Sequence, residues 1–545
     1  MKRKPLVALI VAIILICSVI FGSCSIESGR HFTAVTFTGK TQEGSPITYD
    51  FDEQLEQEFV TLMDECDKLV AADENYPKFS AAFDRVETLY KYLVDAQMRE
   101  ELLFHMYYKI ENLEKYNYFS QLNTVYDKWH RSILKNIAEG SFRQYYFADK
   151  TDEEIEKVVG KNYPDEYYVL KNEIDDIDSA NSLLDSYDPA NYADIENLYV
   201  RFVSTANAFA EIGGYENYQY YTYENIYGRD YTPADTDDFY DYVKTYVIPA
   251  YKAAKAEYKR ANNALNKKEK KTLNDFFDYR VADIFLDGFD DFYAYKKALG
   301  GSFETVFDDL WREGGAFYIS YEDTVMTAYQ EESPLTKKSL VFFGKNCHGP
   351  LAVVHEFGHY FAAEAGLDSK DFDLSETQSQ ANEALYMNYL SRYGRYSRKI
   401  ADVMSKYHVY SMLNHIVKFT LVNEFEKLVY SDDDFVIGEA EKYVEALRED
   451  IGDCFDDFEL DTYWYKVVIA QAGYYISYST SLVGSYNVYC LAQDDFSGAV
   501  DAYLKLVDYS SHGVKANLES VYEYAGLKNV FSEQTFIDLF GSIGA

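Results

Sequence analysis

The chain has 545 residues, of which 48% are hydrophobic, and this content excludes a mostly disordered protein. A chain of this length can bury a large core and form two or more lobes. The 91 acidic residues outnumber the 52 basic residues, and the formal net charge is −39. Because so acidic a chain offers no basic stripe to neutralise phosphates, we expect no nucleic acid partner.

The N-terminus has the pattern of a bacterial lipoprotein signal. Met1–Lys4 is positively charged, residues 6–21 are almost wholly apolar, and small residues precede Cys24. We therefore expect a signal peptide over 1–24, lipidation of Cys24, and a body that lies outside the cytoplasm and is anchored to the cell membrane by its lipid. The alternative is an uncleaved membrane anchor, because the apolar run is nearly long enough to span a bilayer.

Residues 25–205 are predicted to form an N-terminal helical lobe. A short extended segment at 31–49 comes first, and apolar residues then recur with helical spacing. Only 9 prolines occur in the whole chain, so few positions force a helix to break. We predict helices over 51–72, 78–114, 117–138, 151–162, 165–186 and 191–211.

Residues 206–545 are predicted to form a second domain, which begins close to the glycine pair at 213–214. Its pattern is helical except between 313 and 345, where β-branched and aromatic residues cluster in short runs. The domain is therefore expected to be mainly α with a small sheet. We predict helices over 234–264 and 267–297, strands at 314–320 and 339–343, and helices again after Gly366.

The run His355-Glu356-Phe357-Gly358-His359 follows the predicted strands and is the most informative motif in the chain. Two histidines four positions apart lie about one turn apart on a helix, so both imidazoles leave the same face. This geometry suits a tetrahedral zinc ion, and Glu356 lies close enough to accept a proton from water at the metal. The motif therefore predicts a site for one Zn²⁺ in which Glu356 is the general base.

A third protein ligand is needed, because a catalytic zinc keeps one position open for water. Glu376 and Glu383 are the candidates. They share one face of a helix that is predicted to follow the motif, so either could point at the metal.

The motif, followed by Glu376-x-x-Ser379-x-x-Asn382-Glu383-x-Leu385, resembles the thimet oligopeptidase and oligoendopeptidase F family of zinc metallopeptidases. In that family two histidines and the first glutamate of the second motif bind the metal, so the resemblance implies His355, His359 and Glu376. The connection from His359 to Glu376 is shorter than the usual loop of the family. Glu383 is therefore the reserve ligand, or else an acceptor that orients a ligand histidine.

The resemblance also implies a fold and an activity. The fold is a mainly α, two-lobed zinc-peptidase fold that encloses a deep channel, with a small β-sheet beside the active-site helix. The segment 314–317 resembles the strand that pairs with an extended substrate backbone. Residues 206–545 would be the zinc metallopeptidase domain of a monomeric enzyme that hydrolyses short peptides.

The segment 473–480 is similar to the tyrosine segment of the family. Its tyrosines donate a hydrogen bond to the carbonyl oxygen under attack, and a phenol suits this role because it donates without carrying a charge. Tyr478 and Tyr474 match the pattern best, and Tyr475 is the alternative. The resemblance thus implies that Tyr478 and Tyr474 are catalytic together with Glu356.

Two departures support a rival function, namely the shortened connection before Glu376 and a missing histidine. The family carries a histidine before its tyrosine segment, whereas residues 467–469 of this chain are two valines and an isoleucine. His348 could substitute in space, and His415 is expected to be a packing residue. The rival is a non-catalytic lipoprotein that binds peptides or serves as a scaffold. Glu356 favours the enzyme, because a binding protein has no use for a general base beside two ligand histidines.

Overall fold

The computed structural model describes residues 51–543, apart from 73–74, 162, 185–187, 282–289, 314–316, 321–327, 346, 366–370, 437 and 459–461. The predicted signal peptide over 1–24 with Cys24, the extended segment at 31–49 and the first residues of the predicted strand at 314–320 lie outside the described residues. Within the described part of the chain, no helix has both the length and the apolar character needed to cross a membrane.

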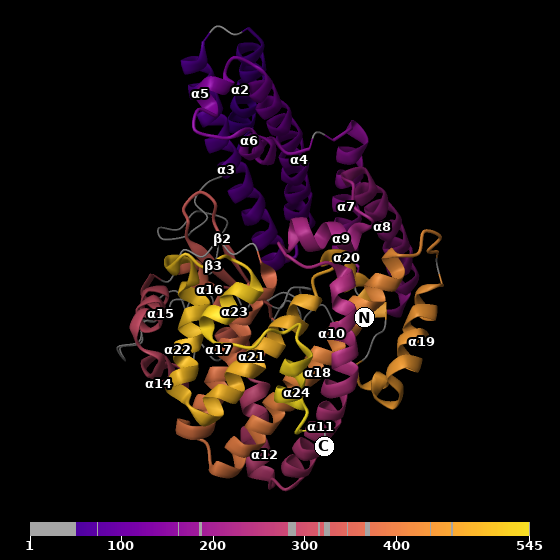
Figure 1. Cartoon of the computed structure of the whole chain (residues 1–545), viewed down its shortest axis with the longest axis vertical. Helices are drawn as coiled ribbons and strands as arrows, with labels where there is room; N and C mark the ends of the chain where they lie inside the picture. Colours follow the sequence, from indigo (N-terminus) through magenta and orange to yellow (C-terminus); the bar gives the residue numbers. More distant parts are fainter. Residues whose placement is uncertain are drawn as a thin grey trace, which may run out of the picture.

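The helices α2 to α6 lie together at the N-terminal end of the molecule, in indigo and purple at the top of Figure 1. Their apolar residues form a core of their own, in which Phe59, Leu89 and Ile133 are fully buried. The rings of Tyr90 and Tyr126 stack across α3 and α4 with their centroids 3.8 Å apart. The bounds are α2 Glu53–Ala72, α3 Tyr76–Tyr107, α4 Ile110–Glu139, α5 Arg143–Tyr146 and α6 Asp152–Val159.

The next two helices, α7 and α8, pack against each other, but their buried residues belong to the core of the rest of the chain. Tyr199 of α8 is fully buried, and its ring stacks on Tyr465 with centroids 5.3 Å apart. α8 also runs through the boundary that we predicted at 205–206. The division into 25–205 and 206–545 stays a prediction. α7 spans Asp165–Ser182 and α8 spans Tyr192–Gly213.

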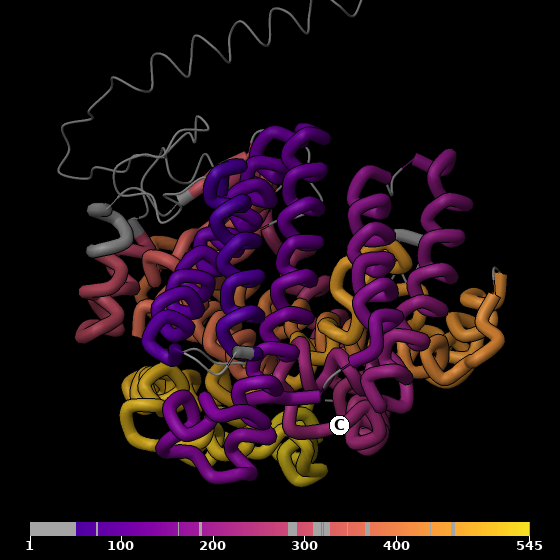
Figure 2. The backbone as a smooth tube through the Cα atoms, turned by 90° about the horizontal axis from the view of Figure 1, so that it is seen from above, coloured from indigo at the N-terminus to yellow at the C-terminus, as the bar shows by residue number. Residues whose placement is uncertain are grey.

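The remaining helices form a large body in which α17 is central, since it packs on α16, α18, α21 and α22. Seen from above in Figure 2, the indigo N-terminal helices lie over one part of this body, with α7 and α8 beside them. The bounds are α9 Tyr218–Tyr221, α10 Thr236–Tyr242, α11 Ile248–Asn263, α12 Lys267–Phe277, α14 Asp290–Leu299, α15 Gly301–Glu313, α16 Pro350–Glu364, α17 Phe372–Tyr393, α18 Arg398–Tyr430, α19 Ala440–Ile451, α20 Thr462–Ala470, α21 Ile476–Asp494, α22 Phe496–Asp508, α23 Leu518–Ala525 and α24 Glu533–Phe540.

A three-stranded sheet of order β1-β3-β2 lies against α16. β3 is buried along its whole length and pairs in parallel with β1 and antiparallel with β2. On the sheet's other side, Leu102 of α3 packs with Leu340 and Phe342 of β3 and so joins the N-terminal helices to it. The mainly α fold with a small sheet beside the histidine helix is confirmed. β1 spans Phe317–Ile319, β2 Ala328–Glu332 and β3 Ser339–Phe343.

Some element boundaries differ from the prediction. α3 ends at Tyr107 rather than near residue 114, because Tyr108 adopts a left-handed conformation with φ 49° and its N–H bonds to the carbonyl of Phe104. α12 ends at Phe277, so the predicted helix over 267–297 is not continuous. The sequence does not indicate β2, whose largely polar residues are held by pairing with β3 rather than by an apolar pattern.

Candidate metal centre and active site

The two histidines of the motif lie on α16 and face α17. Pro350 begins α16, where its missing N–H costs no hydrogen bond. The Nε2 atoms of His355 and His359 are 3.2 Å apart. Gly358 lets the helices approach closely, because a Cβ at this position would lie 2.6 Å from the Cα of Ser379. The glycine inside the motif therefore brings α17 within reach of the two imidazoles.

α17 supplies the third group. Asp371 caps the helix by accepting the N–H of Leu374, and Glu376 follows in the second turn. The Oε2 atom of Glu376 lies 3.4 Å from Nε2 of His355, and its Oε1 lies 3.8 Å from Nε2 of His359. In the part of the chain that the structure describes, these three residues alone converge as a potential metal-binding group.

The spacing of these atoms fits zinc. Ligand atoms at 2.0–2.1 Å from a tetrahedral ion are separated by about 3.3 Å. The observed separations of 3.2, 3.4 and 3.8 Å lie close to this value. Two imidazole nitrogens and one carboxylate are also the donor set of many catalytic zinc sites. The residues present therefore fit the ion that the motif implies.

The other ring nitrogens of the histidines are occupied. Nδ1 of His355 lies 2.7 Å from Oε1 of Glu383, and Nδ1 of His359 lies 3.1 Å from Oγ of Ser375. Such contacts orient an imidazole and present its Nε2 to a metal. Of the two glutamates that spacing left open, Glu376 therefore lies with the Nε2 atoms, and Glu383 lies behind His355.

The charges of the site depend on this packing. Burial alone would raise the pKa of the Glu376 carboxyl, but hydrogen bonds and charges from His355, His359 and Tyr474 outweigh it and lower that pKa. Burial would also lower the pKa of His355, whereas Glu376 and Glu383 raise it well above its usual value. Burial lowers the pKa of His359 to about 4. Glu376 is therefore an ionised carboxylate, as a metal ligand must be.

Glu356 lies on the same helix and differs from these groups. It is 6% exposed, and its Oε2 atom has no hydrogen-bond partner among the described residues. Burial raises the pKa of its carboxyl to about 8, against the opposing charge of His355 and with the support of Glu376 and Glu383. A buried carboxyl oxygen without a partner costs free energy, and such costs are typical of functional sites.

The tyrosines of α21 and the turn before it reach the same centre. The hydroxyl of Tyr474 donates to Oε1 of Glu376 and lies 3.4 Å from the hydroxyl of Tyr478. Tyr478 is partly exposed, so a bound molecule could reach it. Tyr475 points elsewhere, since its hydroxyl donates to Oε1 of Gln471 at 2.7 Å. The structure thus brings the hydroxyls of Tyr474 and Tyr478 together near Glu376. The hydroxyl of Tyr475 is directed away, although its ring lies 5.5 and 6.1 Å from the rings of Tyr474 and Tyr478.

The sequence did not identify the group that holds this turn, which is the guanidinium of Arg229. Arg229 is completely buried, and it donates to the carbonyl oxygens of Gly473 at 2.8 Å and Tyr474 at 3.1 Å. Its Nε donates to Oδ1 of Asp373 on α17 at 3.0 Å. Arg229 therefore connects the turn that carries Tyr474 to the helix that carries Glu376.

Asp373 receives further bonds. Its carboxylate accepts hydrogen bonds from Tyr231 at 2.5 Å, Ser477 at 2.5 Å and Thr480 at 2.7 Å. The rings of Tyr223 and Tyr227 lie 4.2 and 4.7 Å from the guanidinium carbon of Arg229. Arg229 lies in the run 228–233, but nothing in the spacing of this run predicts its contacts with Asp373, Gly473 and Tyr474, which are far away along the chain.

Solved structures of the same fold were found by comparison. A Bacillus anthracis protein that bears the name oligoendopeptidase F matches 92% of this chain and 98% of its own, with a TM-score of 0.67 and 14% identity. PZ peptidase A, solved with an inhibitor, matches 91% and 97%, with a TM-score of 0.68 and 14% identity. Oligoendopeptidase F from Enterococcus faecium matches 90% and 97%, with a TM-score of 0.55 and 13% identity. The chain has the oligoendopeptidase F fold.

The likeness lies in the fold, since no protein-family model and no curated protein sequence matches this chain. Val467, Val468 and Ile469, which stand where the resemblance led us to expect a histidine, are buried apolar residues of α20. Nδ1 of His348, the residue that could substitute in space, is hydrogen-bonded to the carbonyl of Asp278 at 2.9 Å. The side chain of His415 is exposed, although its ring lies 5.4 Å from that of Phe419, so the structure meets the expected packing role only in part.

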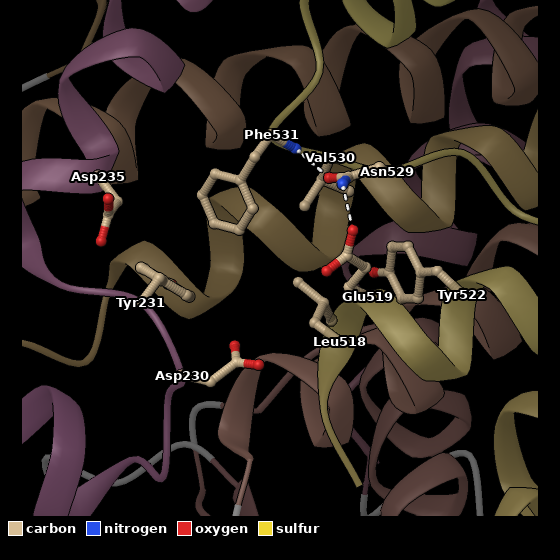
Figure 3. Close-up of a pocket in the computed structure, with 9 residues that line it drawn as sticks. All are labelled: Asp230, Tyr231, Asp235, Leu518, Glu519, Tyr522, Asn529, Val530 and Phe531. Atoms are coloured by element: carbon tan, nitrogen blue, oxygen red, sulfur yellow. Dashed lines mark hydrogen bonds between the residues drawn. The ribbon is translucent and has the colours of Figure 1, made fainter. Parts of the chain in front are cut away.

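A separate cavity of about 310 Å³ lies between the segment that follows Arg229 and the C-terminal helices (Figure 3). None of the predicted site residues lines it. It does touch the supports of the site, because Tyr231 in its wall donates to Asp373 and Tyr522 in its wall is hydrogen-bonded to Thr377 of α17 at 2.6 Å. The cavity is thus behind the candidate metal centre and is no part of it.

Proposed function

We propose that the chain is a zinc-dependent metalloendopeptidase that hydrolyses short peptides. The observation that carries the proposal is the convergence of two imidazole Nε2 atoms and the Glu376 carboxylate beside Glu356, which has an oxygen without a partner. The names of the solved structures that share the fold support peptide hydrolysis. His355, His359 and Glu376 would hold one Zn²⁺ per chain.

Zinc at such a site acts as a Lewis acid and makes water nucleophilic at neutral pH. In its ionised form, Glu356 would accept the proton of the attacking water and would deliver it to the leaving amine when the peptide C–N bond breaks. No covalent intermediate with the protein is needed, because water forms the new C–O bond directly.

The two tyrosines have different roles in this proposal. Tyr474 donates to Glu376 and so holds the carboxylate in place. Tyr478 is partly exposed, and its hydroxyl can donate to the oxyanion that forms at the attacked carbonyl. A single such donor contributes about 3 kcal/mol to the stability of a transition state.

The test is digestion of a mixed peptide library by purified residues 25–545, with the cut bonds identified by mass spectrometry. Digestion should require about one zinc per chain, stop with a chelator and return when Zn²⁺ is added. A protein that purifies without zinc and cleaves nothing after zinc is added would instead favour the non-catalytic, peptide-binding lipoprotein.

Two substitutions separate the ligand from its support. Glu376→Gln should abolish tight zinc binding, because it removes a ligand. Glu383→Gln should weaken zinc affinity about 10- to 100-fold, because it removes the carboxylate that orients His355. Titration of each metal-free variant with Zn²⁺ against a competing chelator measures both effects. The reverse order of losses would identify Glu383 as the ligand.

We also propose that the enzyme acts outside the cytoplasm as a lipid-anchored monomer, with no nucleic acid partner. The support is the signal-like segment before Cys24 and the strongly acidic composition of the chain. Cys24→Ser should either release the processed protein from the membrane fraction or leave it with its signal peptide uncleaved. Membrane retention of a processed Cys24→Ser variant would contradict the anchor.

A further inference from the structure

Beside the candidate metal centre, α18 and α21 pack in a register that hydrogen bonds define. Oγ of Ser479 donates to the carbonyl of Ile416 at 3.0 Å, and Oγ1 of Thr420 donates to Oγ of Ser479 at 3.1 Å. Residues 415 and 419 of α18 therefore lie at the level of Tyr478 on α21. Two side chains that the motifs did not identify, His415 and Phe419, are thus brought next to the site.

An aromatic shelf, formed by Phe419, Trp464, Tyr475 and Tyr478, extends from the site along α18. The ring of Phe419 lies 5.0 Å from that of Tyr478 and stacks on that of Tyr475 at 5.4 Å. Trp464 meets Tyr475 edge-on at 5.2 Å. Phe419 and Tyr478 are partly exposed, whereas Trp464 and Tyr475 are buried and support them. The shelf therefore offers apolar ring surface that begins at Tyr478.

His415 lies one helical turn before Phe419, and their ring centroids are 5.4 Å apart. Its side chain is exposed and has no hydrogen bond to another described residue. Nevertheless, desolvation and the charge of Lys418 lower its pKa to about 4. The His415 imidazole is therefore neutral at pH 7. It can donate a hydrogen bond to a peptide group or accept one from it.

Lys418 adds a positive charge at the same place. Its Nζ lies 5.0 Å from the centroid of the Trp464 ring, and its charge acts on His415. Lys418 therefore puts a positive charge at the edge of the aromatic shelf, where it attracts a carboxylate. Aromatic surface, a neutral imidazole and a cation therefore adjoin one another next to the catalytic groups.

We propose that the aromatic shelf, His415 and Lys418 form a substrate subsite that takes an apolar side chain beside the cleaved bond and a nearby carboxylate. This inference rests on the proposed peptidase function. The apolar side chain, preferably an aromatic one, lies on Phe419 and Tyr478. Lys418 binds the carboxylate, which comes from the C-terminus of the peptide or from an acidic side chain.

The test uses short peptides built on a sequence that the zinc-loaded protein cleaves. One set has phenylalanine or alanine beside the cleaved bond. A second set compares a C-terminal carboxylate with an amide, and a third compares aspartate with asparagine near the cleaved bond. We expect phenylalanine to raise kcat/KM about 10- to 100-fold over alanine. We expect at least one of the two carboxylates to raise it about fivefold, and added salt to reduce that preference.

Three variants assign these preferences to residues. Phe419→Leu keeps an apolar side chain of similar size and should reduce the preference for phenylalanine about 3- to 10-fold. Lys418→Gln should bring the ratio of kcat/KM between peptides with and without the carboxylate close to one. Lys406→Gln is the matched control on α18, since Lys406 pairs with Asp402 on the surface, and it should leave both preferences as in the wild type.

The failure of this inference differs from the failure of the proposed function. A zinc-loaded wild type that cleaves no peptide would contradict the peptidase function itself. If every peptide is cleaved with ratios of kcat/KM near one within each set, the subsite is overturned while the peptidase function stands. The same holds if Phe419→Leu and Lys418→Gln leave these ratios unchanged. If only the C-terminal carboxylate matters, the subsite receives the end of the peptide, and if only aspartate matters, it receives a side chain.

Discussion

Glu356→Gln should reduce kcat about 10²- to 10⁴-fold while the protein still folds and binds zinc. Glutamine has the shape of glutamate but cannot take a proton from water, so the variant loses general base catalysis and keeps the ligands. The free oxygen of Glu356 has no partner among the described residues, so no structural hydrogen bond through that oxygen is lost. Peptide cleavage rates at saturating substrate, with zinc content measured on the same samples, give the answer.

The stability of Glu356→Gln supplies an independent check. Burial raises the pKa of Glu356 from its usual value to about 8, so the folded protein holds this proton more tightly than the unfolded chain does. For such a group, stability decreases as the pH rises from about 4.5 through 8. Glutamine has no proton to lose, so the metal-free variant should melt at or above the wild-type temperature at pH 7.

Glu364→Gln is the matched control, because Glu364 is an exposed glutamate in the last turn of the same helix. It should keep wild-type kcat and zinc content. A Glu356→Gln protein with the kcat of the wild type would show that Glu356 is not the base. A variant that loses its zinc as well as its activity would place Glu356 among the metal ligands instead.

Much of the candidate metal centre was predictable because its key spacing is local. His355 and His359 meet on one helix face wherever the helix lies, so a four-residue interval suffices. The choice between Glu376 and Glu383 is different, because both share a face of α17 and only the approach of α17 to α16 at Gly358 separates their roles. That approach depends on packing across the core, which spacing along the chain does not determine.

The fold shows the same division. The long helices and the strand at 339–343 follow from apolar periodicity, whereas β2 depends on its partner β3 and the end of α3 depends on one left-handed residue, Tyr108. The aromatic shelf and the exposure of His415 depend on the register of α18 against α21, which hydrogen bonds between distant residues set. Contacts of this kind carry no local signal.

Arg229→Met should destabilise the protein by about 3–5 kcal/mol. Arg229 and Asp373 form an ion pair in which both side chains are completely buried, with the nitrogen and oxygen 3.0 Å apart. Removal of one partner leaves the other as an uncompensated buried charge, and this is the main source of the loss. The Gly473 and Tyr474 carbonyl oxygens also lose their donors. Denaturation by urea at pH 7 measures the change in the free energy of unfolding.

Arg201→Met is the matched control, because Arg201 pairs with Glu173 at 2.9 Å where both side chains are solvent-exposed, by 56% and 35%. Exposed pairs contribute about 0–1 kcal/mol, so this variant should unfold almost as the wild type does. Arg229→Lys keeps the charge but not the planar fork that reaches Asp373 and two carbonyl oxygens together, and it should recover only part of the loss.

The same pair bears on activity through Tyr474. When Arg229 no longer holds the 473–474 carbonyl groups, the Tyr474 hydroxyl loses its fixed position on Glu376, and zinc affinity should fall in the fraction of Arg229→Lys that stays folded. A simple loss of stability would lower the amount of folded protein but leave the zinc affinity of that fraction unchanged. If folded Arg229→Lys binds zinc as tightly as the wild type, Arg229 contributes to stability alone. If Arg229→Met is as stable as Arg201→Met, the buried ion pair does not stabilise the fold as proposed.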